Sequence, residues 1–450
     1  MNGIRSRLAA AVESLRGPGL AAVLARGAAG NLVVSGIGAL VLVGVQLLLA
    51  RLLGAVEFGY FLYAITLVSV LGLGTRLGMD TAQVRYVPAY RAQGDWPRLV
   101  GILRFGDRLA LALGTALGVL FAGAVWLLRD AVEPGLARAL WIAATTLPVA
   151  GGLIYLRGSA LQGLKRVELA PLPDAIVRPL LLAALVGVTY LFRGFATGAQ
   201  AMAANLGAAI GGVAVGSALL RRQLPGEARV LTPVTETRTW LRTAWPLSLV
   251  AGMRFLLHQT DILLIGILAD TTTAGIYGAA SRLSRLVTFG LSAANSISAP
   301  MISELHSKGS MRPLQRMVTL TSWGTTLWSL AFAAALALGS PLLLGLYGEE
   351  FRAGTLVLVI LAAGQVVNGA TGPVGYLLNM TGHERTNARI LAWVVLLHLT
   401  LCAPAILAFG PEGAAAVTAA LGATKNLWTW WQVKQRLGVN SSIFSSLQAS

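Results

Sequence analysis

The chain has 450 residues, of which 56% are hydrophobic and 12% are charged, and its mean hydropathy is +0.71. Soluble proteins carry about 25% charged residues, so this composition excludes a soluble protein and indicates an integral membrane protein. The formal net charge of +17 would suggest nucleic-acid binding in a soluble chain. Here the basic residues lie mostly between apolar stretches, as in loops that set membrane orientation. We therefore expect membrane lipids, and no nucleic acid, as partners.

Residues 1–26 open the chain with a segment that has the pattern of an amphipathic helix. Leu8, Val12 and Leu15 recur at helical spacing, and arginines lie on the other side of the helix. The apolar run that follows is too long for a signal peptide and lacks a convincing cleavage site. We expect this segment to be retained and to lie on the cytoplasmic surface of the membrane.

Twelve apolar stretches follow, each near the length of about 20 residues that crosses a bilayer. They lie near residues 30–50, 58–80, 105–128, 139–158, 171–192, 197–220, 244–268, 273–301, 317–339, 353–380, 388–410 and 412–434. If the N-terminus is cytoplasmic, 23 basic residues fall in the cytoplasmic gaps and five in the outer gaps. This asymmetry follows the positive-inside rule and predicts that both termini are cytoplasmic.

The twelve stretches divide into two halves of six. We predict an N-terminal lobe over residues 27–220, a cytoplasmic linker over 221–243, a C-terminal lobe over 244–436 and a flexible tail over 437–450. The linker is charged and contains proline and glycine, which is typical of a connection between domains.

A weak internal repeat relates the two halves. Gly59 and Gly275 both follow short turns and lie 216 residues apart, while Gly163 and Gly382 lie 219 residues apart. Because six is even, both halves enter the membrane in the same direction, and parallel repeats of this kind enclose a central cavity. The predicted fold class is an all-α polytopic membrane protein, with twelve transmembrane helices in two parallel six-helix lobes around a central cavity.

The most highly charged apolar stretch is residues 254–285, two predicted helices joined by a polar turn at Asp270 to Thr273. Its ionisable residues are Arg254, His258, Asp261, Arg282 and Arg285. Such residues inside a membrane usually face a cavity or a partner.

Helix geometry suggests how this hairpin is arranged. At 1.5 Å per residue, Asp261 and Arg282 lie roughly 14 and 15 Å below the turn, so they are level. They could form a pair that holds two helices together. Alternatively, the surplus of arginines provides a cationic site for a diphosphate. His258 could couple transport to protons or could serve only as a hydrogen-bonding group.

Two pairs of charged residues lie in the first half. Arg76 with Asp80, and Asp174 with Arg178, have the i, i+4 spacing of local ion pairs on a helix. We interpret both pairs first as local charge neutralisation. Arg76 and Arg178 are secondary candidates for the lining of the cavity.

Several classes of function find no support in the sequence. The chain has no phosphate-binding loop of the G-x-x-x-x-G-K-[ST] type, and its four histidines and its single cysteine, Cys402, form no metal-binding motif. One cysteine cannot form a disulfide within the chain. We expect no catalytic residues, no metal and no cofactor.

Several stretches together resemble a known family. They are ARLLGAVEFGYF, RLGMDTAQVRYVPAYRAQGD, GIYGAASRLSRL, SAPMISELHSKG and YLLNMTGHERTNARI. In order and spacing they are similar to the oligosaccharide flippase family of the multidrug/oligosaccharidyl-lipid/polysaccharide exporter superfamily, over roughly residues 28–436. Arg282 matches an arginine that faces the cavity in the related lipid II flippases, where an aspartate stands in place of Ser281.

The resemblance implies a protein that is not an enzyme. It implies alternating access and transfer of a polyprenyl diphosphate-linked oligosaccharide from the inner to the outer leaflet of the bacterial cytoplasmic membrane, for surface polysaccharide or O-antigen synthesis. The expected substrate-binding residues are Arg282, Arg285, Arg254, Asp261, His258, Arg76 and Arg178. A polysaccharide polymerase and glycosyltransferases are the expected functional partners, and the chain is expected to be a monomer.

Two alternatives remain open. A cation-coupled exporter of the multidrug type would need an acid inside the first half, where Asp80 and Asp107 each lie beside an arginine. A membrane glycosyltransferase or ligase of the same pathway would need a sizeable outer loop with acid and base residues. No outer gap between the apolar stretches is long enough to supply one.

Overall fold

The computed structural model describes residues 20–226 and 231–441, and every regular element in these ranges is helical. The elements of the first half are α2 (Leu20–Arg76), α3 (Met79–Gln93), α4 (Trp96–Leu127), α5 (Pro134–Thr146), η1 (Leu147–Leu153), α6 (Ile154–Gly163), η2 (Leu172–Val177), α7 (Arg178–Arg193) and α8 (Gly198–Gln223). Those of the second half are α9 (Thr237–Leu268), α10 (Thr271–Ser284), η4 (Arg285–Thr288), α11 (Phe289–Ser307), α12 (Met311–Gly345), η5 (Glu349–Gly354), α13 (Thr355–Thr371), α14 (Val374–Met380) and α15 (Glu384–Leu437).

The helices account for twelve membrane passes. Eight helical segments among the described residues are long and apolar enough to cross a membrane. Two of them, in α2 and α15, bend back at Gly54 and Gly410, whose φ angles of +75° and +62° suit glycine. Each therefore supplies two passes, and α9 and the run from α10 to α11 complete the twelve. The predicted all-α membrane fold is confirmed.

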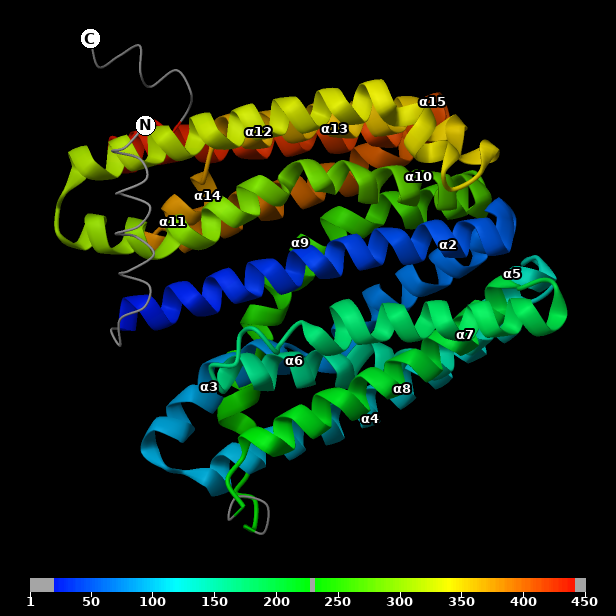
Figure 1. Ribbon diagram of the computed structural model, residues 1–450, viewed down its shortest axis with the longest axis horizontal. Helices are drawn as coiled ribbons and strands as arrows, with labels where there is room; N and C mark the ends of the chain where they lie inside the picture. The colour runs from blue at the N-terminus through cyan, green and yellow to red at the C-terminus, as the bar shows by residue number, and fades with distance from the viewer. Residues whose placement is uncertain (1–19, 227–230, 442–450) are drawn as a thin grey trace.

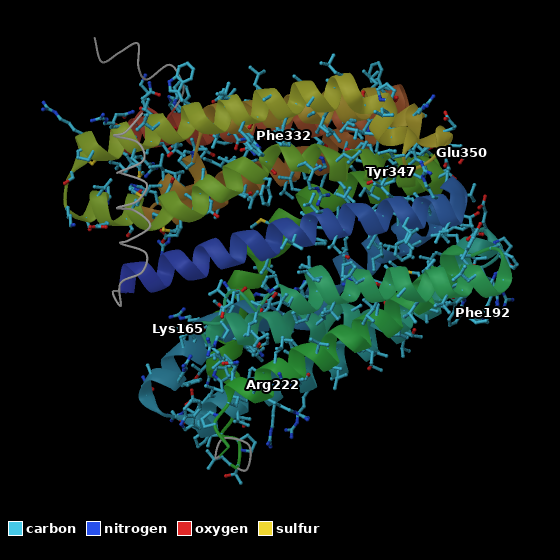
Figure 2. The ribbon with its side chains drawn as sticks, in the orientation of Figure 1. Lys165, Phe192, Arg222, Phe332, Tyr347 and Glu350 are labelled. Atoms are coloured by element: carbon cyan, nitrogen blue, oxygen red, sulfur yellow. The ribbon has the colours of Figure 1, made fainter. Side chains whose placement is uncertain are left out.

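The passes form two bundles, with α3 to α8 in one and α10 to α15 in the other (Figure 1). In Figure 2, Phe192 and Glu350, which border predicted outer gaps, lie at one end of the molecule. Lys165 and Arg222, which belong to predicted cytoplasmic gaps, lie away from that end. The path of the chain therefore alternates between the two ends as the charge pattern predicts.

The same packing contact occurs in both halves. A Cβ atom added at Gly135 would lie 2.6 Å from the Tyr60 ring, and one added at Gly354 would lie 2.9 Å from Ile276 Cγ2. Gly354 follows Gly135 by 219 positions, and Ile276 follows Tyr60 by 216. These are the two offsets of the predicted repeat, so the structure supports an internal duplication.

The two repeats meet at the glycines that the repeat predicts to be equivalent. A Cβ atom at Gly275 in α10 would lie 2.9 Å from Gly59 Cα in α2, and one at Gly59 would lie 2.4 Å from the Thr271 carbonyl oxygen. Only glycine allows the backbones to approach this closely. Contact between equivalent residues is expected when two parallel repeats are related by an axis along the membrane normal.

The predicted linker, residues 221–243, ends in ordered structure against the first half. Helix α9 begins within it, and Trp240 is fully buried and donates from Nε1 to Tyr90 Oη at 3.0 Å. Glu236 forms an ion pair with Arg98 at 2.7 Å. Helix α9 therefore starts on the first half and continues into the second.

The predicted flexible tail, 437–450, begins with residues bound to α12. Gln315 Oε1 accepts from the Asn440 backbone N–H at 2.8 Å, and Ser322 Oγ donates to the Ser441 carbonyl oxygen at 2.6 Å. Residues 442–450, and residues 1–19 of the predicted amphipathic segment, lie outside the described residues.

Candidate functional site

A cavity of about 600 Å³ lies inside the second half of the chain. Its walls come from α9, α10, η4, α11, α13, α14 and α15 and the turn before α14. The volume is within the range of about 300–1,000 Å³ typical of ligand-binding pockets. The sequence predicted a cavity between the two halves, whereas the described lining of this cavity, which includes part of the charged hairpin, comes from the second half.

The hairpin that carries the charges folds as its sequence predicts. Asp270 caps α10, because its carboxylate accepts from the Thr273 backbone N–H at 2.7 Å, which satisfies a free donor of the first turn. At its other end α10 tightens into the 3-10 turn η4, which starts at Arg285 and leads into α11. Such turns inside long helices often mark functional positions, and here the turn lies on the cavity wall.

Arg285 is exposed and lines the cavity. Among the described residues, no carboxylate lies within 4.0 Å of the guanidinium groups of Arg285 or Arg282. Arg282, one turn earlier, is half-buried and is not among the cavity-lining residues. Of the two hairpin arginines whose side chains the structure describes, Arg285 is therefore the one that presents positive charge to the cavity.

Asp261 is 3% exposed and has partners that the sequence did not indicate. His398 Nε2 lies 2.9 Å from its Oδ1 atom, and the Tyr277 and Thr418 hydroxyls both donate to its Oδ2 atom, the second at 2.8 Å. The predicted pair of Asp261 with Arg282 is wrong. Equal depth did not bring the two side chains together, because depth does not fix the direction in which each helix faces.

His398 is the residue of this cluster that the sequence interpretation missed most clearly. It lies 137 positions after Asp261, on a different helix, and is 1% exposed. A histidine inside a predicted membrane span is itself a sign of a polar partner. That signal was present, although it could not identify Asp261 as the partner.

Asp261, His398 and Cys402 bring potential metal-ligating atoms within 4.8 Å of one another. Asp261 Oδ2 accepts from two hydroxyl groups, and its Oδ1 atom lies 2.9 Å from His398 Nε2. This arrangement fits an internal ion pair reinforced by hydroxyl donors, as buried carboxylates require. The cluster therefore fixes α9, α10 and α15 together at one wall of the cavity.

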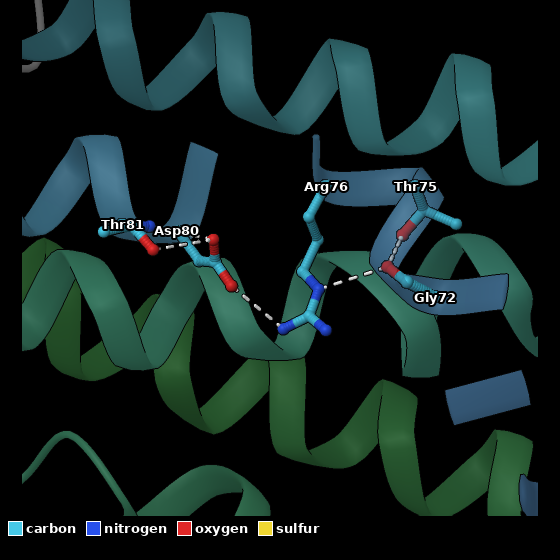
Figure 3. A network of polar contacts seen from close by, with 5 residues as sticks. All are labelled: Gly72, Thr75, Arg76, Asp80 and Thr81. Atoms are coloured by element: carbon cyan, nitrogen blue, oxygen red, sulfur yellow. Dashed lines mark hydrogen bonds and ion pairs between the residues drawn. The ribbon is translucent and has the colours of Figure 1, made fainter. Parts of the chain in front are cut away.

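The two arginines of the first half that were predicted to line a cavity, Arg76 and Arg178, form ion pairs. Arg76 contacts Asp80 at 3.0 Å, donates to the Gly72 carbonyl oxygen at 3.1 Å, and lies 4.1 Å above the Tyr155 ring (Figure 3 shows the first two contacts). The i, i+4 pairing predicted for Arg76 is present.

Two further pairs in the first half follow the same pattern. Arg178 contacts Asp174 at 2.8 Å and donates to Asn205 Oδ1 at 3.1 Å. Arg157 binds both oxygens of Asp107 at 2.9 Å. Each of these arginines is therefore neutralised by a carboxylate from its own half.

Two residues of the predicted site cannot be placed. Arg254 and His258 lie on α9, and their side chains are outside the described part of the structure. Their role in substrate binding stays a prediction.

The family model of the polysaccharide biosynthesis proteins matches residues 24–306, more than half of the chain. The chain belongs to the polysaccharide biosynthesis protein family. The resemblance predicted from the sequence is therefore confirmed.

A curated relative and two solved structures extend this comparison. The chain is 27% identical over 160 residues to the probable low-salt glycan biosynthesis flippase Agl15 of Haloferax volcanii, a match that covers 35% of this chain and 34% of that protein. An inward-facing multidrug resistance MATE family transporter of the MOP superfamily superposes with a TM-score of 0.68 at 14% identity, over 94% of this chain and 96% of that one. The lipid II flippase MurJ, in an inward closed conformation, superposes with a TM-score of 0.67 at 16% identity, over 89% of this chain and 87% of that one.

These structural likenesses show the fold. The match to the curated relative spans about a third of that protein's length. Family and fold together identify a polysaccharide biosynthesis protein with the fold of the superposed membrane transporters.

Proposed function

We propose that the protein is a flippase that moves a polyprenyl diphosphate-linked oligosaccharide from the inner to the outer leaflet of the cytoplasmic membrane by alternating access. The product would serve the assembly of a surface polysaccharide or O-antigen. In this proposal both termini are cytoplasmic, the chain acts as a monomer, and glycosyltransferases and a polymerase act before and after it. The family membership and the transporter fold support this class of function.

The observation that carries the proposal is Arg285, which lines the cavity without a carboxylate at ion-pair distance among the described residues. A charge enclosed within a membrane protein is costly unless it is paired or hydrated. A diphosphate supplies the missing negative charge, and the planar guanidinium can bind phosphate oxygens through two parallel hydrogen bonds. Hydrogen bonds of this kind contribute about 1.5–3 kcal/mol each.

The other predicted residues take supporting roles in this proposal. Arg282 adds positive potential one turn away from Arg285, and Arg254 and His258 extend the hairpin on α9. Asp261 holds the wall of the cavity through its contact with His398. Arg76 and Arg178 are bound to their own carboxylates and serve the first half of the transporter.

The alternative of a cation-coupled exporter has less support. Such an exporter would use an acid in the first half, but Asp80 and Asp107 are both paired with arginines. The alternative of a glycosyltransferase or ligase does not fit a family and fold that indicate a transporter.

The test is transport in proteoliposomes with a fluorescent, polyprenyl diphosphate-linked sugar. Arg285→Gln should lower the initial rate by about tenfold to a hundredfold, which corresponds to the loss of a charge-assisted hydrogen bond. Arg312→Gln is the matched control, because Arg312 is exposed on α12 and is not among the cavity-lining residues. Equal rates for both variants and the wild type would remove Arg285 from the binding site.

A further inference from the structure

The cavity contains an unusual number of amide side chains for so apolar a protein. Six asparagine and glutamine residues, from four helices, line it together with Arg285: Asn295, Gln365, Asn368, Asn379, Asn387 and Asn426. Burying an amide without a hydrogen-bond partner is unfavourable, and this matters most inside a membrane. A concentration of amides at one cavity therefore requires either mutual pairing or a polar ligand.

Mutual pairing satisfies only part of this set. Asn426 Nδ2 donates to Asn368 Oδ1 at 3.0 Å, Asn368 Nδ2 donates to Gln365 Oε1 at 3.3 Å, and Asn387 Nδ2 donates to Asn379 Oδ1 at 3.0 Å. Among the described residues, these bonds leave Gln365 Nε2 and Asn379 Nδ2 as donors. They leave the amide oxygens of Asn426 and Asn387 as acceptors.

Asn295 is the clearest sign of a missing partner. Its side chain is 9% exposed and lines the cavity, and its Oδ1 atom is buried with no hydrogen-bond partner in the described structure. An unsatisfied buried acceptor costs about 1–3 kcal/mol. A hydroxyl group of a ligand in the cavity would donate to this oxygen and remove the cost.

Asn295 and Arg285 lie at different points along the cavity wall. Asn295 follows Arg285 by ten positions, which corresponds to about 15 Å along the helix. The cavity is therefore long enough to hold a charged group near Arg285 and further polar groups beyond it.

The charges of the lining limit what those further groups can be. The ionisable residues among the described lining are Arg285, Lys425 and Asp261, and Asp261 is engaged with His398. A diphosphate would bind the positive charge of Arg285, whereas Lys425 already interacts within the protein. In the lining that the structure describes, carboxylates on the sugars would find no further cation, but hydroxyl and acetamido groups would find donors and acceptors in the amides, which can serve as either.

We propose that the amide-lined part of the cavity binds the uncharged, hydroxyl-rich sugar units next to the diphosphate, and that the protein selects neutral over acidic glycans. This inference rests on the flippase function proposed above. The interaction that would recognise such sugars is the hydrogen bond between a side-chain amide and a sugar hydroxyl.

The experiment compares three fluorescent lipids in proteoliposomes: bare polyprenyl diphosphate, the same lipid with a neutral N-acetylated disaccharide, and the same lipid with a uronic acid disaccharide. The wild type should move the neutral glycolipid about threefold to tenfold faster than the acidic one. Asn295→Leu and Asn368→Leu, which preserve side-chain size, should each slow the neutral glycolipid by a similar factor, as expected for the loss of a neutral hydrogen bond. Their effect on bare polyprenyl diphosphate should be smaller, because that lipid carries no sugar to bind the amides.

The outcomes separate the two proposals. If Arg285→Gln stops all transport but the asparagine variants change nothing, the sugar site is refuted and the flippase proposal stands. Equal or faster wild-type transport of the acidic glycolipid also refutes the sugar site, and this comparison does not depend on any variant folding. If the wild type moves none of the three lipids, the flippase function fails and the sugar site fails with it.

Discussion

The two halves of the molecule share a packing plan but treat their arginines differently. In the first half, Arg76, Arg157 and Arg178 each contact a carboxylate within 3.0 Å. In the second half, Arg282 and Arg285 have no described carboxylate within 4.0 Å. A paired arginine adds no net charge to the membrane interior, whereas an unpaired one needs water or a ligand. These three arginines of the first half are neutralised within the protein, whereas Arg285 in the second half can receive an anion.

The largest stability effect that tests this difference is expected at Arg157. Its side chain is 11% exposed, and Arg157→Gln would leave Asp107 without its counter-ion. Removing one partner of a buried pair destabilises by about 3–5 kcal/mol, and partial exposure of Asp107 favours the lower end. The thermal midpoint in detergent should fall, and the double variant Arg157→Gln/Asp107→Asn should recover most of it.

Arg285→Gln is the counterpart in the second half. It should leave the thermal midpoint unchanged or higher, because it removes a charge with no close carboxylate. A fall as large as that of Arg157→Gln would show that the two halves do not differ in the way described.

A smaller effect is expected where the two repeats touch. Gly59→Ala places a methyl group against the Thr271 carbonyl oxygen, and overpacking of this kind costs about 1–3 kcal/mol. Gly44→Ala is the matched control, because a Cβ atom there meets nothing within 4 Å. Thermal midpoints and transport rates should fall for the first variant and not for the second. Equal behaviour would mean that the contact between α2 and α10 is not close in the working protein.

The smallest effect concerns the residues after Gly94 and Gly309, two glycines 215 positions apart, close to the offset of 216 between Gly59 and Gly275. Asp95 caps α4 by accepting from the Arg98 backbone N–H at 3.1 Å, whereas Ser310 makes no such bond to α12. Asp95→Ala should cost about 1 kcal/mol, and Ser310→Ala should have no measurable effect.

The cap at Asp95 also has a pH dependence with a defined sign. The Arg98 backbone N–H, together with the Arg98 side chain, lowers the pKa of the Asp95 carboxyl. The stabilisation that this cap contributes is therefore fully present when the pH is above the ordinary pKa of an aspartate. It is lost as the pH falls through the lowered pKa of Asp95. Unfolding measured below pH 4 should show a smaller difference between wild type and Asp95→Ala than at pH 7. A constant difference would exclude the charged cap.

Much of this architecture could be predicted from the sequence, because its determinants are local. Apolar length sets the passes, Asp270 marks the turn of the hairpin, and the i, i+4 spacing of Arg76 and Asp80 identifies their pair. The offset between Gly59 and Gly275 indicated the repeat, and the structure places these glycines in contact.

The chemistry of the cavity could not be predicted in the same way, because it depends on which way each helix faces. Asp261 meets His398 from a helix 137 positions later, and no spacing rule connects them. The amides are spread over four helices and are individually unremarkable in the sequence. Only the packed bundle shows that they surround the same space as Arg285.

Binding of a short, soluble polyprenyl diphosphate to the purified protein tests the central difference between the halves most directly. The wild type and the charge-neutral double variant Arg157→Gln/Asp107→Asn should bind with similar affinity. Arg285→Gln should bind about tenfold to a hundredfold more weakly, as expected for a lost charge-assisted hydrogen bond. Unchanged affinity for Arg285→Gln, or an equal loss in the double variant, would contradict a diphosphate site in the second half.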